Sequence, residues 1–335
     1  MNPVSAPSLP GATLRTTDAA GVRYAVARWD APAHSGSADA SAAAGGPGPD
    51  ASPVPPVLLL HGVPQTALMW RYLAPELAQR RPVIAPDLKG LGRSGTDGRY
   101  EVTALADGIA HLLRTELPGI PGGPRVDVVG HDWGVVIGLA LARQHPDLVR
   151  RLVVVNGPYR SINVVRAAHA LFFALPALPE KLHARRGAQL VRDMIRAVWR
   201  SGRTLEPQVL EEYVAAYDDP ARFSAMLGYY RANVRSTAGR RARGLLARGK
   251  RRPEVPAVRA ERHLVVWGAA DPVLPLSVGE SVVRDLGEDT AFVTVPGAGH
   301  FVLEEAPEVV NPVIVGFLDE TGWPRSRPPS GPPAE

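Results

Sequence analysis

The sequence predicts an α/β fold in which a mostly parallel sheet is flanked by helices and a helical segment is inserted late in the chain. Short runs rich in β-branched residues alternate with longer runs of helical character, as expected for parallel strands joined by crossover helices. Glycines flank a strand-to-helix turn at Gly130–Gly134, and residues 157–252 have a helical pattern with few strand candidates. The expected strands are residues 14–17, 22–29, 57–60, 83–85, 126–129, 151–155, 263–267 and 291–295.

The composition is that of a globular protein large enough to bury a sizeable core. The chain has 335 residues and is 45% hydrophobic. No apolar run approaches the length of about 18 residues that a membrane span needs, and the N-terminus lacks the pattern of a secretory signal. Cysteine is absent, so we expect no disulfide framework, no thiolate metal site and a cytoplasmic location. We expect a monomer or homodimer that needs no cofactor and no metal.

The net charge of +5 has its basic excess concentrated in residues 235–252. A nucleic-acid or anionic surface is conceivable there. However, no aromatic residues interleave with these charges and no nucleic-acid motif accompanies them. We therefore interpret the segment as a solvated connector and expect neither a nucleic-acid nor a membrane partner.

The N-terminal part of the core begins with a predicted β-hairpin whose turn contains Gly21. Residues 30–56 are dominated by Ala, Gly, Pro and Ser, which predicts a disordered loop within a single fold. The strand at 57–60 leads directly into His61-Gly62-Val63-Pro64. A later glycine-rich loop begins at Asp87, which we interpret as an Asx-type loop anchor. The core helices expected are residues 68–79, 103–117, 135–142 and 307–319.

The turn Gly130-His131-Asp132-Trp133-Gly134 is the strongest chemical signal in the sequence. It matches the G-x-nucleophile-x-G pattern, with Asp132 where serine usually stands. The flanking glycines let strand and helix approach closely while the central residue takes a strained conformation. The N-terminus of the following helix favours a negative charge, so Asp132 could attack as a carboxylate. The alternative is an Asp that only caps this helix.

Asp132, Asp271 and His300 appear in the order nucleophile, acid and histidine. Each follows a predicted strand, so all three are expected to meet at the carboxyl edge of the parallel sheet. Asn156 follows the strand at 151–155 and carries no charge, which favours Asp271 as the acid. In the alternative reading, Asp271 is a turn former and His300 a packed or surface histidine.

This turn resembles that of the epoxide hydrolase and haloalkane dehalogenase branch of the α/β-hydrolases, in which Asp replaces Ser as the nucleophile. The resemblance extends from about Gly21 to about Trp323, apart from the inserted loop, and is closest to the epoxide hydrolases. It includes His61–Gln65, Asp87–Ser94 and Gly297–His300. It implies an α/β-hydrolase fold with a core of residues 1–156 and 253–323 and a helical cap of residues 157–252. The proline-rich residues 324–335 are expected to be a disordered tail.

The resemblance also implies a two-step covalent mechanism. Asp132 would attack an sp³ carbon of the substrate and form an alkyl-enzyme ester. His300, oriented by Asp271, would then deprotonate the water that attacks this ester. The backbone N–H groups of Val63 and Trp133 would form the oxyanion hole.

The leaving group separates the subclasses of this branch. An opening epoxide needs proton donors, which the family supplies from two cap tyrosines; Tyr230 matches the second, and His169 stands in place of the first. Either residue could instead serve only in packing. A protonated His169 acting as acid would displace the pH profile toward acid. A halide needs N–H donors, and the Trp133 indole offers one, but Val63 replaces the asparagine of many haloalkane dehalogenases.

The sequence therefore predicts an epoxide-hydrolase-like enzyme that acts on small apolar organic substrates. A haloalkane dehalogenase is the first alternative. The second is a catalytically idle ligand-binding protein with a hydrolase fold.

Overall fold

The computed structural model of the protein describes residues 9–32, 54–118, 120, 125–158, 168–246 and 257–321; side chains are described for all of these except residues 168 and 234–246. Most of the expected disordered loop, residues 33–53, lies outside the described residues. The expected disordered tail and residues 247–252 of the basic segment also lie outside them.

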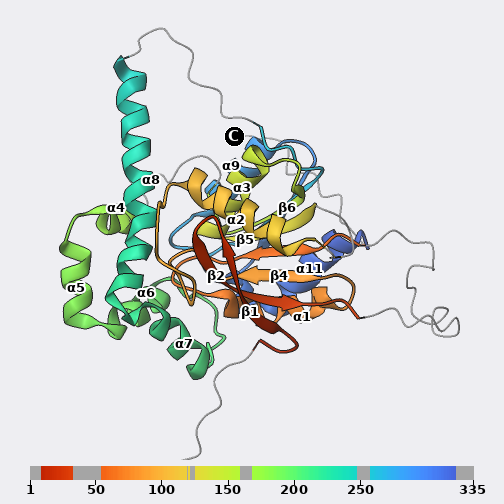
Figure 1. Cartoon of the computed structure of the whole chain (residues 1–335), viewed down its shortest axis with the longest axis horizontal. Coiled ribbons are helices and arrows are strands. Elements are labelled where there is room, and N and C mark those ends of the chain that lie inside the picture. Colours follow the sequence, from red (N-terminus) through yellow and green to blue (C-terminus); the bar gives the residue numbers. More distant parts are fainter. Residues whose placement is uncertain are drawn as a thin grey trace, which may run out of the picture.

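One eight-stranded sheet forms the centre of the molecule, with the strand order β1-β2-β4-β3-β5-β6-β7-β8 (Figure 1). Strand β2 is antiparallel to both of its neighbours, and β3 to β8 pair in parallel. All the expected strands are confirmed, and β6 begins two residues earlier than predicted. The strands are β1 (Thr13–Ala19), β2 (Val22–Trp29), β3 (Val57–Leu60), β4 (Val83–Pro86), β5 (Val126–His131), β6 (Val149–Val155), β7 (His263–Gly268) and β8 (Thr290–Val295).

The inner strands are continuous apolar runs because helices cover the sheet. Every residue of β3, β4, β5 and β7 is buried, as expected for strands covered on both faces. The edge hairpin differs, because β1 alternates exposed and buried positions near its end. Its turn has φ of 49° at Ala20 and 74° at Gly21, the pair of positive values that a two-residue hairpin turn needs.

The helices of the core are arranged around this sheet. Helix α2 packs on α3, α1 contacts α11, and Figure 1 shows the two pairs on different sides of the sheet. Helices α9 and α10 had not been expected from the sequence. The core helices are the 3₁₀ helix η1 (Ala67–Arg71), α1 (Leu73–Ala78), α2 (Val102–Glu116), α3 (Trp133–Gln144), α9 (Leu276–Leu286), α10 (Val302–Glu305) and α11 (Pro307–Asp319).

The single helix predicted for residues 68–79 is wrong in one respect, because the structure divides it into η1 and α1. A continuous α-helix would need a hydrogen bond from residue 75 to the carbonyl of Arg71. Pro75 has no N–H to donate, and its ring would clash with that carbonyl. The Thr66 hydroxyl oxygen accepts a hydrogen bond from the Leu68 N–H and begins η1 instead.

Among the described residues, five helices lie between β6 and β7 and gather beside the core, on the left of Figure 1. We call them the inserted helices: α4 (Ala168–Ala174), α5 (Leu178–Arg186), α6 (Ala188–Val198), α7 (Pro207–Asp218) and α8 (Pro220–Leu246). Helix α8 begins after Asp219, whose carboxylate accepts hydrogen bonds from the N–H groups of Ala221 and Arg222 at 2.7 and 3.1 Å. In the part of the chain that the structure describes, no helix is long and apolar enough to cross a membrane.

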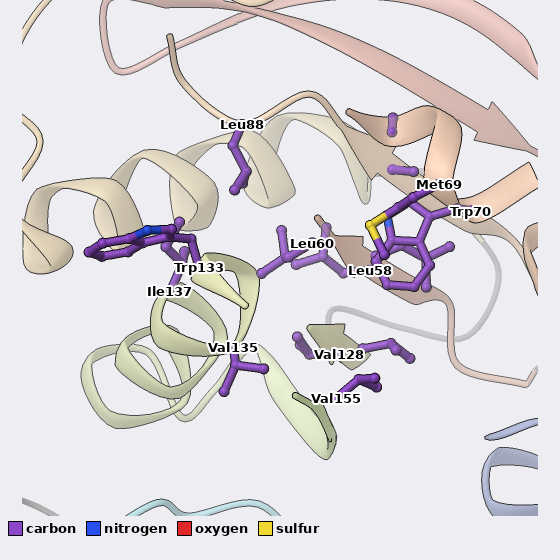
Figure 2. Packing of buried hydrophobic residues seen from close by; sticks show 14 of the residues in the cluster. Leu58, Leu60, Met69, Trp70, Leu88, Val128, Trp133, Val135, Ile137 and Val155 are labelled. Carbon is purple, nitrogen blue, oxygen red and sulfur yellow. The ribbon is translucent and has the colours of Figure 1, made fainter. Parts of the chain in front are cut away.

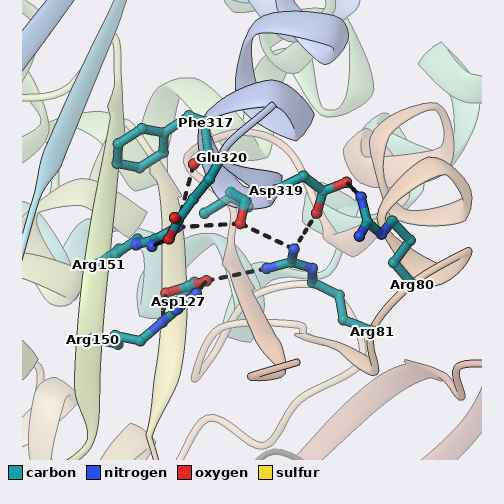
Figure 3. A network of polar contacts seen from close by, with 9 residues as sticks. Arg80, Arg81, Asp127, Arg150, Arg151, Phe317, Asp319 and Glu320 are labelled. Carbon is teal, nitrogen blue, oxygen red and sulfur yellow. Dashed lines mark hydrogen bonds and ion pairs between the residues drawn. The ribbon is translucent and has the colours of Figure 1, made fainter. Parts of the chain in front are cut away.

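A buried ionic network closes the amino end of the strands (Figure 3). Asp127, at the start of β5, is fully buried and accepts hydrogen bonds from Arg150 Nε at 2.8 Å and from Arg81 Nη1 at 3.3 Å. Arg81 also binds the Asp319 carboxylate and the Leu318 carbonyl at the end of α11. A buried carboxylate is stable only when it is paired in this way. The network therefore joins two strands to the C-terminal helix, far along the strands from the candidate site.

Candidate active site

The turn between β5 and α3 holds Asp132 in a conformation that a side-chain-bearing residue seldom adopts. Its φ is 49° and its ψ is −116°. A Cβ on Gly134 would lie 1.9 Å from the Leu60 carbonyl oxygen, and one on Gly130 would lie 2.7 Å from the Gly134 oxygen. The Asp132 side chain makes no capping hydrogen bond to the N–H groups of the second or third residue of α3, so the alternative of a simple helix cap does not describe this residue.

Buried hydrophobic residues pack around the elements that flank the turn (Figure 2). Leu60 and Val128 in the strands, and Val135 and Ile137 in α3, are at most 1% exposed. Close packing of this kind restrains the backbone on both sides of Asp132. The site is therefore built on rigid elements, with its central carboxylate projecting beyond the sheet edge.

Two backbone N–H groups meet at the Asp132 carboxylate. The Val63 N–H donates to Oδ2 at 3.0 Å, and the Trp133 N–H is the second donor. Burial raises the pKa of Asp132, while the nearby His300 and these two donors oppose that rise. Gly62 permits the close approach, since a Cβ there would lie 2.5 Å from the Asp132 Cβ. The two donors predicted from the sequence thus face the same side chain.

His300 lies between the two carboxylates that the sequence analysis selected. Its Nδ1 is 2.8 Å from Asp271 Oδ2, and its Nε2 is 3.9 Å from Asp132 Oδ1. Burial lowers the pKa of His300, but the Asp271 carboxylate, followed by Asp132, outweighs burial and leaves this pKa above its usual value. The pKa of Asp271 is below its usual value, because His300 and hydrogen-bond donors outweigh the opposing effect of burial.

Asn156 has a role at this site that the sequence analysis missed. Its side-chain amide donates to Asp271 Oδ2 at 2.7 Å, and its Oδ1 accepts from the Gly268 N–H at 3.0 Å. Asp271 Oδ1 accepts from the N–H groups of Val273 and Leu274 at 2.7 and 2.9 Å. The sequence contains no local signal for this contact, which depends on the pairing of β6 with β7 in the sheet.

A cavity of about 210 Å³ opens above these residues. Asp132 and His300 lie at its base, and Tyr230 and His169 line it from the inserted helices. The remaining lining is apolar, and neither Lys nor Arg contributes to it among the described residues. The other lining residues are Val63, Pro64, Phe173, Met194, Ala197, Val198, Val273 and Phe301.

Tyr230, on α8, lies against the Trp133 indole with the ring centroids 5.3 Å apart. Burial raises the pKa of Tyr230, as does the Asp132 carboxylate, while a hydrogen bond with the Trp133 side chain opposes the rise. The indole N–H can only donate, so the Tyr230 oxygen is the acceptor in this pair. The phenol therefore stays protonated at neutral pH and keeps its own O–H for another partner.

His169, on α4, lies next to Tyr230 with the ring centroids 6.2 Å apart. Burial lowers the pKa of His169 to about 4, and repulsion from His300 acts in the same direction. The imidazole is thus neutral at pH 7, which disfavours the imidazolium acid considered from the sequence. A neutral imidazole still carries one N–H donor.

Two further motif residues hold loops around the site. His61 Nε2 accepts a hydrogen bond from the Leu88 N–H at 2.9 Å. The Asp87 carboxylate accepts from the N–H groups of Ala67 and Arg93, both at 2.8 Å. The prediction that Asp87 is a structural loop anchor is therefore confirmed.

The chain is similar to proteins of known sequence and structure. The sequence profile of the alpha/beta hydrolase family matches residues 57–313. Epoxide hydrolase 4 of Mus musculus is 26% identical over 281 residues, or 79% of this chain and 73% of the mouse protein. The 2-(acetamidomethylene)succinate hydrolase of Mesorhizobium japonicum is 30% identical over 271 residues, or 79% of this chain and 88% of that protein. A solved structure of a presumed epoxide hydrolase from Pseudomonas aeruginosa is 27% identical, with a TM-score of 0.70, over 94% of this chain and 98% of its own.

The profile match extends from β3 into α11 and so covers most of the sheet together with the inserted helices. Both named curated relatives are hydrolases. The resemblance expected from the sequence is confirmed: the chain is a hydrolase and belongs to the alpha/beta hydrolase family.

Proposed function

We propose that this protein is an epoxide hydrolase that converts small apolar epoxides to diols through an ester on Asp132. The observation that carries this proposal is a half-buried carboxylate at the strained turn, facing an apolar cavity that a protonated Tyr230 also lines. In this reading, the inserted helices are the cap that covers the reacting groups. The similarity to epoxide hydrolases supports the choice of substrate.

In the first step, Asp132 attacks one carbon of the epoxide ring, and the bond from that carbon to the ring oxygen breaks. The ring oxygen takes the Tyr230 proton as its negative charge develops, which leaves a hydroxyalkyl ester and a tyrosinate. The neutral imidazole of His169 donates a second hydrogen bond to the same oxygen. This role replaces the protonated histidine, because the pKa of His169 is about 4.

In the second step, His300 Nε2 removes a proton from water, and the resulting hydroxide attacks the Asp132 ester carbonyl. The N–H groups of Val63 and Trp133 stabilise the oxyanion, as their approach to the carboxylate supports. Tyr230, whose pKa is raised, regains its proton from solvent once the ring has opened. Collapse then releases the diol and regenerates the Asp132 carboxylate, and His300 returns its proton to solvent. The balance is one epoxide and one water for one diol.

A haloalkane dehalogenase is the less favoured alternative. A departing halide needs N–H donors, but the Trp133 indole already hydrogen-bonds Tyr230. The Val63 side chain has no donor. The cavity also contains a phenolic proton that halide displacement does not require.

Single turnover in heavy-oxygen water tests the covalent route, with styrene oxide as the substrate and mass spectrometry of the active-site peptide as the readout. The label should appear in the Asp132 carboxylate and be absent from the first equivalent of diol. Label in that diol would show that water attacks the ring directly. The same assay with 1-chlorohexane should release no chloride.

A further inference from the structure

Glu305 is a buried carboxylate immediately after the loop that carries His300. It lies in α10, is 3% exposed, and accepts hydrogen bonds from four backbone N–H groups. Its Oε2 accepts from Arg200, Ser201 and Gly299 at 2.8, 2.7 and 3.0 Å, and its Oε1 accepts from Phe301 at 3.2 Å. Burial of a carboxylate requires such a set of donors.

These donors belong to two segments that are distant in the sequence. Gly299 and Phe301 flank His300, whereas Arg200 and Ser201 follow inserted helix α6. The His300 N–H also approaches the Val198 carbonyl oxygen at 3.4 Å. The two segments therefore meet directly beside the imidazole, with Glu305 bonded to both.

The contact leaves little room for movement. A Cβ on Gly299 would lie 2.5 Å from the Val198 oxygen and 2.8 Å from Glu305 Oε1. Val198 and Phe301 both line the cavity. A shift of either segment would consequently change the cavity wall and the direction of the His300 ring together.

Glu305 also contributes charge near the imidazole. Its carboxylate acts in the same direction as Asp271 and Asp132, raising the pKa of His300, and is the smallest of these three influences. The ionisable groups that face His300 from the surrounding elements are Asp132, Asp271, Glu305, His131 and His169.

We propose that Glu305 is a positioning residue that fixes the His300 loop against the segment following α6. It acts through His300 and touches no reacting atom. The assignment rests on the proposed function, in which His300 is the base for ester hydrolysis. Loss of the carboxylate should therefore slow the second half-reaction more than the first.

Two glutamates near Glu305 in the sequence have other partners and serve for comparison. The Glu304 carboxylate binds Arg71 and Gln65 and accepts a hydrogen bond from Tyr213, and among the described residues it makes no hydrogen bond to the His300 loop. Glu308 is exposed and pairs with Arg203 at 3.2 Å, in the same region as the segment that Glu305 holds. Glu308→Gln is thus a matched control for loss of charge on this side of the protein.

The test compares wild type, Glu305→Gln, Glu305→Asp and Glu308→Gln in two measurements. Rapid-quench mass spectrometry with styrene oxide separates formation of the ester from its decay. Titration of the imidazole by NMR on protein with ¹⁵N-labelled histidine gives the pKa of His300, assigned by the signal that disappears in His300→Gln. Thermal unfolding establishes that each variant is folded.

Glu305→Gln keeps the length of the side chain but removes its charge and one acceptor oxygen. Ester decay should slow by roughly tenfold to a hundredfold, in line with a small misplacement of a reacting group, and the pKa of His300 should fall. Glu305→Asp keeps the charge but shortens the reach, so ester decay should slow with a smaller fall in that pKa. Glu308→Gln should match wild type in both measurements.

If both the rate of ester decay and the pKa of His300 were unchanged in Glu305→Gln, the positioning role would be overturned. Equal slowing of ester decay in Glu308→Gln would also overturn it, since the effect would then be a general loss of charge. If wild type failed to convert styrene oxide, the proposed function would fail, while the imidazole titration would still decide whether Glu305 acts on His300.

Discussion

The Nδ1 of His300 lies 2.8 Å from Asp271 Oδ2, and this contact decides which nitrogen faces Asp132. Because Nδ1 is held by the carboxylate, Nε2 is the nitrogen directed toward the nucleophile. Nε2 can then take a proton from water beside an ester on Asp132, while Nδ1 stays bound to Asp271. The predictions below follow from this geometry and from the groups around it.

Replacement of His300 by Gln should leave ester formation intact and stall ester hydrolysis. Asp132 and Tyr230 do not need the imidazole for the first step, whereas water activation does. Intact-protein mass spectrometry after mixing with styrene oxide should show a mass increase of one substrate molecule. Sustained turnover by His300→Gln would remove His300 from the role of base.

The pH dependence should differ between the two steps. The pKa of His300 is raised in the free enzyme, in part by the charge of Asp132. The ester form of Asp132 carries no charge, so this contribution disappears in the intermediate. Ester decay needs neutral His300, so its rate should rise with pH through a lower pKa than that measured by NMR for the free enzyme. If the rate of ester decay rose with pH through a pKa equal to or above that of His300 in the free enzyme, His300 would not be the base for this step.

Asp271→Asn offers a separate check on the sign of this effect. Removal of the carboxylate takes away the largest influence that raises the pKa of His300. The rising limb of ester decay should therefore move to lower pH, while its plateau falls because the imidazole loses its orientation. If the pH-dependent rise in the rate of ester decay moved to higher pH in Asp271→Asn, Asp271 would not be the charge that raises the pKa of His300.

Tyr230→Phe should slow ester formation by roughly a hundredfold or more, the usual contribution of a positioned acid. Tyr229→Phe is the matched control, since the Tyr229 hydroxyl donates to the Lys89 carbonyl oxygen at 2.6 Å and its side chain does not line the cavity. Rapid-quench measurement of ester formation distinguishes the two variants. Equal rates for Tyr230→Phe and Tyr229→Phe would leave Tyr230 with packing alone.

Replacement of Asp127 by Asn should destabilise the fold without altering the chemistry. Removal of one partner from a buried ionic network costs about 3–5 kcal/mol in the free energy of unfolding. Arg80→Gln removes a more exposed partner of Asp319 and should cost at most about 1 kcal/mol. Urea unfolding measures both, and an Asp127→Asn variant as stable as Arg80→Gln would contradict this account of the network.

Local sequence pattern was sufficient to predict the sheet and the central turn. The strands are short apolar runs rich in β-branched residues, and Gly130 and Gly134 mark the point where β5 meets α3. The break at Pro75 could have been predicted from its missing N–H. Helix α9, in the segment after Asp271, was not predicted.

The contacts between distant segments were beyond the reach of such patterns. Asn156 binds Asp271 only because β6 and β7 are neighbours in the sheet. Glu305 meets Arg200 because the segment after α6 returns to the His300 loop. The neutral state of His169 likewise depends on its burial in the folded protein. Each of these features depends on packing between parts of the chain that no local spacing specifies.

The crowding at Gly134 also bears on how chemistry can change in this architecture. A Cβ there would lie 1.9 Å from a main-chain oxygen, so the position is closed to every other residue type. The backbone of the turn consequently has no freedom to be remodelled around a new reaction. Residue 132, in contrast, projects away from this crowded crossing. Divergence toward other reactions must then proceed by exchange of the one projecting side chain and of the residues lining the cavity, with the underlying turn inherited unchanged.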